Sequence, residues 1–307
     1  MRLFAYNDAK NYGRALCHYF SLLGHEARLF TSAGEVPEGE DVVCFIRMLH
    51  YPLSVRTYNK QVMEELNKKN VLLIPNIKEI RLHDDKVKQY KTFGDWMPKT
   101  WFTEDYYKAL ALVREVTYPL VSKAAEGASA CNVRLIKNDK EALQEIVQIF
   151  LRENGIPLYL KNHYQKNYIL WQEYLYQSKG NDWRVTLIAK KYAAGFERFV
   201  RDPDKPFASG SGKRRIFTNV DKQVASLFDL GYKFATEFDL SMACIDVVYD
   251  SNGKPFILEN SSAWGMYAYP ECVWFEKTSA GWIPTEYVGD KQWQLIAKAI
   301  SDREFHK

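Results

Sequence analysis

The sequence has no long hydrophobic run and only five cysteines, and each shortage argues against a class of protein. No apolar stretch approaches the ~18–20 residues that a transmembrane helix needs. The first ten residues, MRLFAYNDAK, lack the apolar core of a signal peptide. The cysteines are scattered and never form a C-x-x-C pair, which disfavours a disulfide framework and a zinc site. We therefore expect a cytoplasmic protein with no membrane partner.

The chain also lacks the short motifs of several common enzyme classes. The strand-like segment 2–6 is followed by Asn7-Asp-Ala-Lys-Asn-Tyr-Gly13 rather than by G-x-G-x-x-G. A dinucleotide-binding domain therefore loses its main support. The six histidines show no metal-ligand spacing, and no Ser-His-Asp or Cys-His arrangement stands out.

Strand-like and helical segments alternate over the first quarter of the chain. The strand-like segments are 2–6, 27–31, 42–46 and 71–75, and helical patterns cover 11–23 and 54–69. This alternation predicts a parallel, doubly wound α/β sheet. From Asn76 the character changes, and a charged helix is expected over residues 78–93. A length of 307 residues suits two or three small domains.

Positive charge is concentrated in one segment. The net charge of the chain is only +4, but residues 190–215 hold eight lysines and arginines and three acids, a net charge of +5. Such a cluster favours an anionic ligand, such as a phosphate, a carboxylate or a nucleic acid. The alternative is a solvated basic face.

Oxygen-bearing side chains gather where a late apolar strand ends. Two strand-like segments, 243–249 and 255–259, are joined by a glycine turn, and antiparallel pairing would place Asp246 near Glu259. Two carboxylates and the amide of Asn260 would suit Mg²⁺. A hairpin with solvent-facing acids is the alternative. Asp246 argues against it, because it interrupts an apolar strand and a buried carboxylate must be paired or bound to metal.

Two lysines and one apolar stretch suit a phosphate-bearing ligand. Lys123 ends an apolar strand before the small-residue loop 126–132, where backbone N–H groups and an ammonium can reach phosphates. Lys86 follows two aspartates, and its spacing alone predicts a surface residue. The stretch 171–175 carries one acid, which fits a purine slot with a ribose acceptor, or equally an edge strand with one exposed glutamate.

Eight short motifs follow one another along the chain. They are Asp85-Lys86, Pro119–Lys123 with its small-residue loop, Gln172-Glu173-Tyr174, Asp182-Trp183-Arg184-Val185, Phe196-Glu197-Arg198, Phe207–Gly212, Ile245-Asp246-Val247 and Leu258-Glu259-Asn260. This succession, from about Asn76 to Gly265, resembles the ATP-grasp superfamily, especially its ribosomal-protein glutamate ligase and glutathione synthetase branch.

The resemblance implies an α/β protein (α+β in its core) with an ATP-grasp fold and an N-terminal Rossmann-like domain. The implied domains are residues 1–80, the N-terminal α/β domain, residues 81–175, the small lobe with the phosphate loop, and residues 176–307, the lobe with the metal site.

The resemblance also implies roles for single residues. Lys86 and Lys123 would contact the phosphates of ATP, and Glu173 the ribose. The adenine slot would be lined by Gln172, Glu173, Tyr174 and Leu175.

Arg184 and Arg198 would steady the carboxylate substrate and the transferred phosphoryl group. Asp246 and Glu259 would hold two Mg²⁺ ions, with Glu259 bridging them, Asn260 completing the set and Mn²⁺ as a substitute metal.

The implied function is an ATP- and Mg²⁺-dependent carboxylate–amine ligase that forms an amide through an acyl phosphate. Its partners would be a small acidic substrate or an acidic peptide or protein tail, together with an amine, and nucleic acid is not expected. Two alternatives stay open. One is an ATP-grasp kinase with a hydroxyl acceptor, and the other is a non-catalytic nucleotide- or nucleic-acid-binding module that uses the basic segment 190–215.

The chain departs from the family pattern at three places. The loop after Lys123 is poorer in glycine, and Gly210 stands where an asparagine is common. The family commonly has Glu-x-Asn at the metal strand, whereas this chain has Glu259-Asn260-Ser261, so either Asn260 or Ser261 completes the site. We favour Asn260, because serine is a poor Mg²⁺ ligand. The aromatic segment 264–275 is expected either to wall the substrate pocket or to pack on the C-terminal helix.

Overall fold

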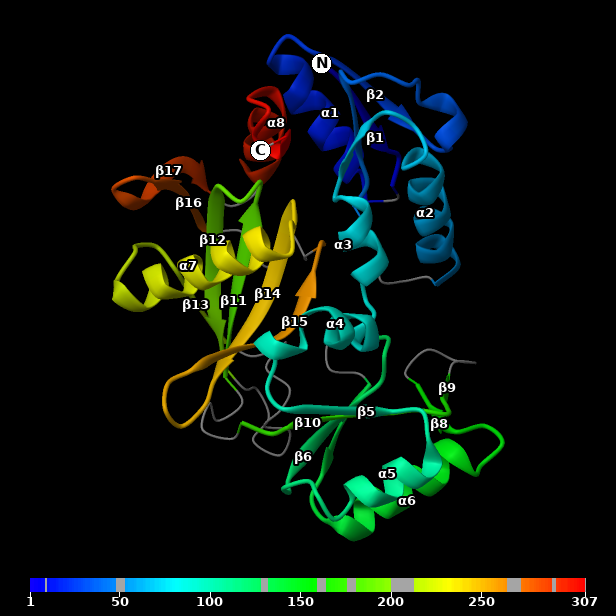
Figure 1. Cartoon of the computed structure of the whole chain (residues 1–307). Coiled ribbons are helices and arrows are strands. Elements are labelled where there is room, and N and C mark those ends of the chain that lie inside the picture. The colour runs from blue at the N-terminus through cyan, green and yellow to red at the C-terminus, as the bar shows by residue number, and fades with distance from the viewer. Residues whose placement is uncertain are drawn as a thin grey trace.

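The computed structural model describes residues 1–8, 10–47, 53–127, 132–158, 164–175, 181–199, 213–263, 272–288 and 291–306. Within these residues three larger sheets follow one another along the chain (Figure 1). No helix in the described ranges is long and apolar enough to cross a membrane.

The first sheet is parallel and has the order β2-β1-β3-β4. Its strands are β1 (Arg2–Tyr6), β2 (Glu26–Phe30), β3 (Val42–Phe45) and β4 (Leu72–Ile74), and its helices are α1 (Tyr12–Leu22) and α2 (Leu53–Leu66), with a short 3₁₀ turn at Ala33–Glu35. Leu3 and Phe4 are both buried but belong to different apolar clusters, because successive side chains of a strand point to opposite faces. Such burial on both faces is typical of parallel sheets.

The helix at the C-terminal end completes this first layer. Helix α8 (Gln292–Ser301) shares one apolar cluster with α1 and β1, and Trp293 stacks on Tyr12 with ring centroids 5.5 Å apart. Figure 1 shows α8 beside α1, so the two ends of the described chain meet on one face of the parallel sheet. A 3₁₀ turn at Glu304–His306 follows α8.

The charged segment after β4 forms two helices rather than the single one expected. They are α3 (Ile77–Leu82) and α4 (Lys86–Phe93), followed by a 3₁₀ turn at Gly94–Trp96. The break falls at Asp84, whose φ of 53° is left-handed and cannot continue a helix. Asp85 then begins α4, because its side chain accepts a hydrogen bond from the N–H of Lys88 at 3.0 Å.

The second sheet is small and antiparallel, in the order β5-β10-β6-β7. Its strands are β5 (Thr100–Thr103), β6 (Leu120–Lys123), β7 (Val133–Ile136) and β10 (Ile169–Glu173), its helices are α5 (Tyr106–Leu112) and α6 (Asp139–Phe150), and β8 (Ile156–Pro157) pairs with β9 (Tyr164–Gln165). Figure 1 shows both helices on one side of the sheet. Leu120, Ile169 and Trp171 point into the core beneath these helices, so the alternate positions face the other way.

The third sheet is antiparallel, with the order β15-β14-β11-β12-β16-β17 and β13 added beside β12. Its strands are β11 (Asp182–Ile188), β12 (Tyr192–Arg198), β13 (Arg214–Ile216), β14 (Met242–Tyr249), β15 (Pro255–Ser261), β16 (Val273–Thr278) and β17 (Gly281–Val288). Helix α7 (Lys222–Glu237) crosses one face (Figure 1). A Cβ atom on Gly231 of α7 would lie 2.6 Å from a methyl carbon of Leu187, so glycine permits this close approach.

Candidate active site

The two predicted metal carboxylates lie opposite each other. In the pairing of β14 with β15, Asp246 is the cross-strand partner of Glu259, which confirms the expected hairpin. Directly opposed residues point to the same face of a sheet. The register shifts next to this pair, between Asp246 and Val247, and Leu258 is the extra residue of the resulting irregularity. Asp246 is buried, whereas the Glu259 side chain is 33% exposed.

Asp246 is gripped by both predicted catalytic arginines. Arg184 donates from Nε to Oδ1 and from Nη2 to Oδ2, each at 2.8 Å, and Arg198 Nη2 lies 2.7 Å from Oδ2. Burial alone would raise the pKa of Asp246, but the charges and hydrogen bonds of the two arginines outweigh it and hold this pKa well below its usual range. Asp246 is therefore an ionised carboxylate, as a metal ligand has to be.

A second carboxylate, Asp182, completes this cluster. Arg198 donates from Nε to Asp182 Oδ1 at 2.6 Å and from Nη2 to Asp182 Oδ2. Burial raises the pKa of Asp182, although Arg198 opposes this. Asp182 belongs to one of the eight sequence motifs, but the motif alone indicates no role for it.

Both predicted phosphate lysines are buried at the same site. Lys86 Nζ lies 3.4 Å from Glu259 Oε2 and donates to the carbonyl of Gly127 at 2.6 Å. The surface position that spacing alone predicted for Lys86 is therefore wrong, since only 7% of this residue is exposed. Spacing along the chain could not predict this burial, because α4 docks against the loop after β6, a contact between segments 41 residues apart.

Lys123 lies on the small sheet, within the electrostatic reach of the same groups. Its Nζ donates to Gln172 Oε1 at 2.6 Å. Burial lowers the pKa of Lys123 to about 8, with Glu259 and Asp246 opposing the shift and Lys86 adding to it. The two lysines and two carboxylates thus form one electrostatic group, with ligand oxygens for a divalent ion and cations for phosphates.

The predicted nucleotide residues lie along and beyond β10. Gln172 is buried beside Lys123 and also donates to Thr100 Oγ1 at 3.0 Å. Glu173 is exposed, Tyr174 is half-buried and Leu175 is buried. Burial raises the pKa of Tyr174.

The same face of the small sheet holds apolar residues that sequence reasoning missed. Val121 is the cross-strand partner of both Gln172 and Leu135. These three side chains face away from α5 and α6, on the side of Lys123. The signal was available, because alternation counted back from Lys123 puts Val121 on its face.

Asn260 does not point toward Asp246 and Glu259. Strand alternation puts its side chain on the face opposite to Glu259, and its Oδ1 accepts from the N–H of Cys244 at 3.2 Å. Ser261 shares the face of Glu259, and its Oγ donates to the carbonyl of Ala263 at 2.5 Å. Among the described residues no group of three or more His, Cys, Asp or Glu side chains could hold a metal ion. A cation at Asp246 and Glu259 would therefore need oxygen ligands of another kind, as Mg²⁺ obtains from phosphates and water.

The start of the small-residue loop is bound by side chains from α2 and from the turn between α3 and α4. Asp84 accepts from the N–H of Gly127 at 3.0 Å and pairs with Arg56, whose Nη2 lies 2.8 Å from Glu126. Gly127 has a φ of 127°, and a Cβ there would lie 2.4 Å from the amide nitrogen of Asn132. Sequence reasoning missed Arg56 and Asp84, since neither belongs to a recognisable motif.

Some predicted features lie wholly or partly outside the described residues. These are loop residues 128–131, Phe207–Gly212 with Gly210, and 264–271 of the aromatic segment. In the described part of that segment, Trp274 and Phe275 are buried in two different apolar clusters, which is a packing role.

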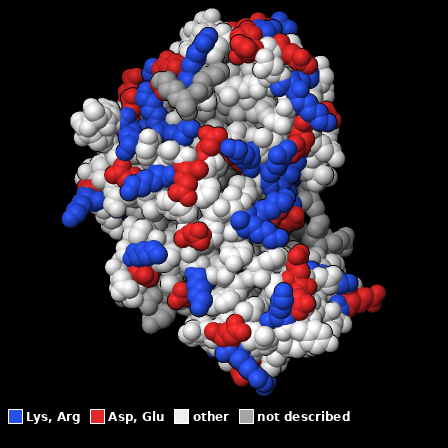
Figure 2. All heavy atoms as spheres, viewed as in Figure 1, with Lys and Arg blue, Asp and Glu red and all other residues white. Residues whose placement is uncertain are grey.

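Ion pairs neutralise much of the positive charge in the described part of the basic segment 190–215. Lys190 pairs with Asp239 at 3.2 Å, and Lys191 with Glu276 at 3.1 Å and Glu304 at 2.9 Å. Arg215 pairs with Glu197 at 2.9 Å. In the view of Figure 2, basic side chains instead gather over α3 and α4, where Lys88 pairs with Asp85 at 3.1 Å.

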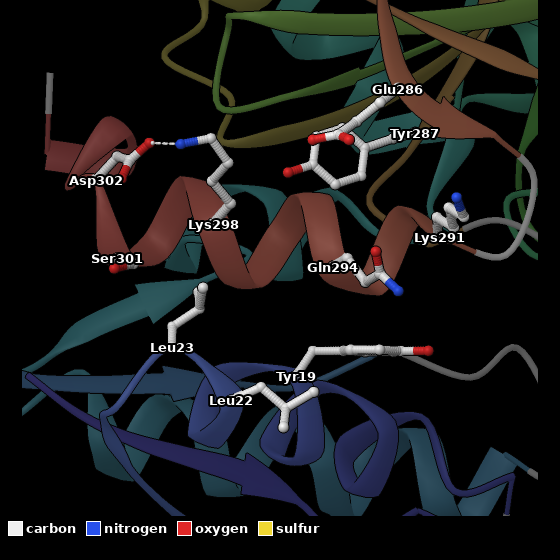
Figure 3. Close-up of a pocket in the computed structure, with 10 residues that line it drawn as sticks. All are labelled: Tyr19, Leu22, Leu23, Glu286, Tyr287, Lys291, Gln294, Lys298, Ser301 and Asp302. Carbon is white, nitrogen blue, oxygen red and sulfur yellow. Dashed lines mark hydrogen bonds and ion pairs between the residues drawn. The ribbon is translucent and has the colours of Figure 1, made fainter.

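A separate hollow of about 360 Å³ lies between α1, α8 and β17 (Figure 3). Tyr19, Leu22 and Leu23 of the α1 region face Gln294 and Ser301 of α8 across it. None of the candidate catalytic, nucleotide or metal residues lines this hollow.

The fold and the family match place the chain in the ATP-grasp class of nucleotide-dependent ligases. The RimK-like ATP-grasp domain matches residues 85–270, and the chain belongs to that family. It is an ATP-dependent, ADP-forming carboxylate–amine ligase, and ATP and Mg²⁺ are the cofactors of the family.

Three similar proteins illustrate the relationship. A probable alpha-L-glutamate ligase 1 of Shewanella sp. (strain W3-18-1) is 27% identical over 241 residues, which cover 75% of this chain and 72% of that protein. A Chryseobacterium gregarium RiPP-associated ATP-grasp ligase, solved with ADP and a leader and core peptide, superposes with a TM-score of 0.63 at 12% identity, covering 98% of this chain and 97% of that one. The ATP-grasp ligase PsnB, solved with a minimal precursor, Mg and ADP, gives a TM-score of 0.56 at 13% identity, covering 86% and 90%. These superpositions confirm the α/β ATP-grasp fold.

Proposed function

We propose that the protein activates a substrate carboxylate as an acyl phosphate and transfers the acyl group to an amine. The observation that carries this proposal is the opposition of Asp246 and Glu259 next to Lys86, with Lys123 within electrostatic reach. In the first step a carboxylate oxygen would bond to the γ-phosphorus as the bond to the β,γ-bridging oxygen breaks, releasing ADP. The amine would then bond to the carbonyl carbon, phosphate would leave, and the amine nitrogen would lose a proton.

The residues of this chain would position and neutralise rather than react. Phosphoryl transfer needs alignment and charge compensation, with little covalent help from the protein. Lys86 and Lys123 would neutralise the phosphates, and Arg184 and Arg198 would steady the carboxylate and the moving phosphoryl group. Because these four cations are at least three-quarters buried, the water that would screen them is largely excluded.

Asp246 and Glu259 would hold Mg²⁺. We propose two ions bridged by Glu259, with Mn²⁺ able to replace Mg²⁺ because it also takes oxygen ligands in octahedral geometry. Bound there, the metal would offset negative charge on the phosphate oxygens. For Asn260 to join the ligand set, its amide would have to leave the N–H of Cys244 and turn to the opposite face.

The nucleotide would lie against the face of the small sheet that points away from α5 and α6. Gln172, Tyr174 and Leu175 would border the adenine, Val121 and Leu135 would add apolar contact, and the exposed Glu173 would accept from the ribose. In this proposal the metal would belong to the lobe of residues 176–307 and the base to the lobe of residues 81–175, with residues 1–80 as the N-terminal domain.

The substrates we propose are a small acidic compound or an acidic peptide or protein tail, together with an amine. To bind Arg184 or Arg198, an anionic donor would have to compete with Asp246 and Asp182, because both arginines are already ion-paired. The Shewanella relative is named a glutamate ligase, and the Chryseobacterium structure contains peptides. The four described cysteines are free thiols, in keeping with the cytoplasmic location that we propose.

The test is a turnover assay with ATP labelled at the γ-phosphate, Mg²⁺, acidic amino acids or peptides, and amines. Equal amounts of ADP, free phosphate and amide are expected, and hydroxylamine should trap the acyl phosphate as a hydroxamate. Label retained on a hydroxyl product would identify a kinase instead. Nucleotide binding without ADP release in any mixture would exclude catalysis.

A further inference from the structure

Two arginines and two aspartates of the large sheet form one closed ionic cluster. Asp182 and Arg198 are cross-strand partners on β11 and β12, and Arg184 and Asp246 are partners on β11 and β14. All four side chains share one face of the sheet, because Asp182 and Arg184 lie two residues apart. The side chains of Asp182, Arg198 and Asp246 are each 8% exposed. Their two positive and two negative charges cancel.

The metal carboxylate of this cluster is already largely occupied. An ionised carboxylate has about four acceptor positions. Asp246 uses one on Oδ1 for Arg184, and two on Oδ2 for Arg184 and Arg198. A metal ion can therefore reach Asp246 through the remaining position on Oδ1 or by displacing an arginine.

Arg198 is shared between two carboxylates. Its Nη2 contacts both Asp182 and Asp246, while its Nε contacts Asp182 alone at 2.6 Å. Asp182 thus accepts two hydrogen bonds from Arg198, whereas Asp246 accepts one. A buried guanidinium must stay paired. Without the charge of Asp182, Asp246 would be the remaining carboxylate partner of Arg198 among the described residues, and the cluster would carry a net positive charge beside the metal position.

We infer that Asp182 is a positioning residue: by holding Arg198 through Nε and Nη2 it limits this arginine to one contact with Asp246, and so leaves a position on Oδ1 of the metal carboxylate for a divalent ion. The inference rests on the proposed metal site and adds a residue that touches neither metal nor substrate. Arg198 is the residue through which it acts.

The test measures Mn²⁺ binding to the full chain with saturating ADP, by the electron paramagnetic resonance signal of free Mn²⁺. Asp182→Asn should weaken Mn²⁺ binding by about tenfold or more, because one uncompensated charge then lies near a divalent ion. The double variant D182N/R198Q should return Mn²⁺ affinity to within about threefold of the unaltered protein, since the misdirected arginine is gone. ADP affinity without metal should stay within about twofold throughout.

Two further variants separate this role from a structural one. Asp229→Asn removes a carboxylate that also pairs with a cation, Lys277 at 2.7 Å, but on α7, and should leave Mn²⁺ affinity unchanged. Asp182→Glu keeps the negative charge and should bind Mn²⁺ within about threefold of the unaltered protein, even if D182N fails to fold.

The outcomes distinguish this inference from the proposed function. Mn²⁺ binding by the unaltered protein, with equal affinity in D182N, would overturn the role of Asp182 alone. The inference would also be overturned if D182N/R198Q or D182E bound Mn²⁺ as weakly as D182N does. If the unaltered protein showed no nucleotide-dependent Mn²⁺ binding, the metal site itself would be overturned, and this inference with it.

Discussion

The side chain of Gln89 forms two hydrogen bonds with the backbone of Asn260. Its Nε2 donates to the carbonyl of Asn260 at 2.8 Å, and its Oε1 accepts from the Asn260 N–H at 3.0 Å. One amide thereby pairs the backbone at the edge of β15 in the way that a further strand would. This contact joins α4, which carries Lys86, to the strand that carries Glu259.

Replacing Gln89 with alanine should therefore destabilise the protein. Two buried backbone groups would lose their partners, which costs about 2–4 kcal/mol in the free energy of unfolding. Urea unfolding measures the change. Thr92→Ala, an exposed position on the same helix, is the control and should change stability by less than about 0.5 kcal/mol. Equal stability of the Gln89 variant and the control would contradict the prediction.

Glu79 should make stability fall as pH rises. This carboxyl is fully buried between α3 and β14, where it accepts from the N–H groups of Met242 at 2.7 Å and Asn76 at 2.8 Å. Burial raises its pKa from 4.5 to about 7, despite these hydrogen bonds. The folded state then holds a proton that the unfolded state releases, so the stabilisation is complete below about pH 4.5 and is lost as pH rises to about 7.

The measurement is the free energy of unfolding at pH 5 and at pH 7.5. A decrease of roughly 2.5 kcal/mol is expected from this one group. Glu79→Gln cannot titrate and should show a flatter pH dependence. An unchanged slope in that variant would assign the effect to other residues.

Lys123 should make nucleotide binding weaken above about pH 8. Its pKa is lowered to about 8 by burial, so the free protein loses this positive charge within the range of ordinary assays. Phosphates bind the ammonium form, so the Kd for ADP should rise with pH through this value. Lys123→Gln should bind ADP about tenfold to a hundredfold more weakly and lose this pH dependence.

Binding of ADP by calorimetry between pH 7 and pH 9.5 checks this prediction. Lys99→Gln is the matched control, because Lys99 is exposed and stacks on Trp101 at 5.1 Å. A control with the same loss of affinity, or a wild-type Kd independent of pH, would argue against a phosphate role for Lys123.

Glu259→Gln should abolish turnover and preserve the fold. The substitution keeps the size of the side chain but removes the charge of a metal ligand, so kcat should fall by about a thousandfold or more. Thermal unfolding should change little, because this side chain is 33% exposed and its ion pair with Lys86 is a single contact at 3.4 Å. Glu286→Gln, at the hollow between α1 and α8, is the control and should retain activity. Full activity of the Glu259 variant would remove the proposed metal site.

Much of the fold could be predicted because its signals are local. The alternation of apolar segments marked the strands of the parallel sheet, and the glycine turn at Gly253 marked the hairpin that opposes Asp246 and Glu259. Local patterns failed where a single backbone angle mattered. The left-handed Asp84 divides a segment whose composition suits one continuous helix.

The candidate site could be predicted only in part, because charges find their partners through distant contacts. A sequence motif contains Arg198 but does not show that Asp182 and Asp246 share its guanidinium. The sequence suggested Asn260 as a third oxygen ligand, but the strand register places its side chain on the face opposite to Glu259. A one-residue change of register reverses every side chain of a strand, and short motifs do not record it.

The sequence by itself determined the order of the elements, the family and the positions of the acids and bases, since these depend on composition and on neighbours along the chain. Only the tertiary structure decided which charges are buried and which of them meet. Lys86 is buried because α4 docks on a loop 41 residues away, and Gln89 forms hydrogen bonds with a strand residue 171 positions away. Desolvation and long-range pairing set the electrostatics of the site, and both come from segments that become neighbours only when the chain folds.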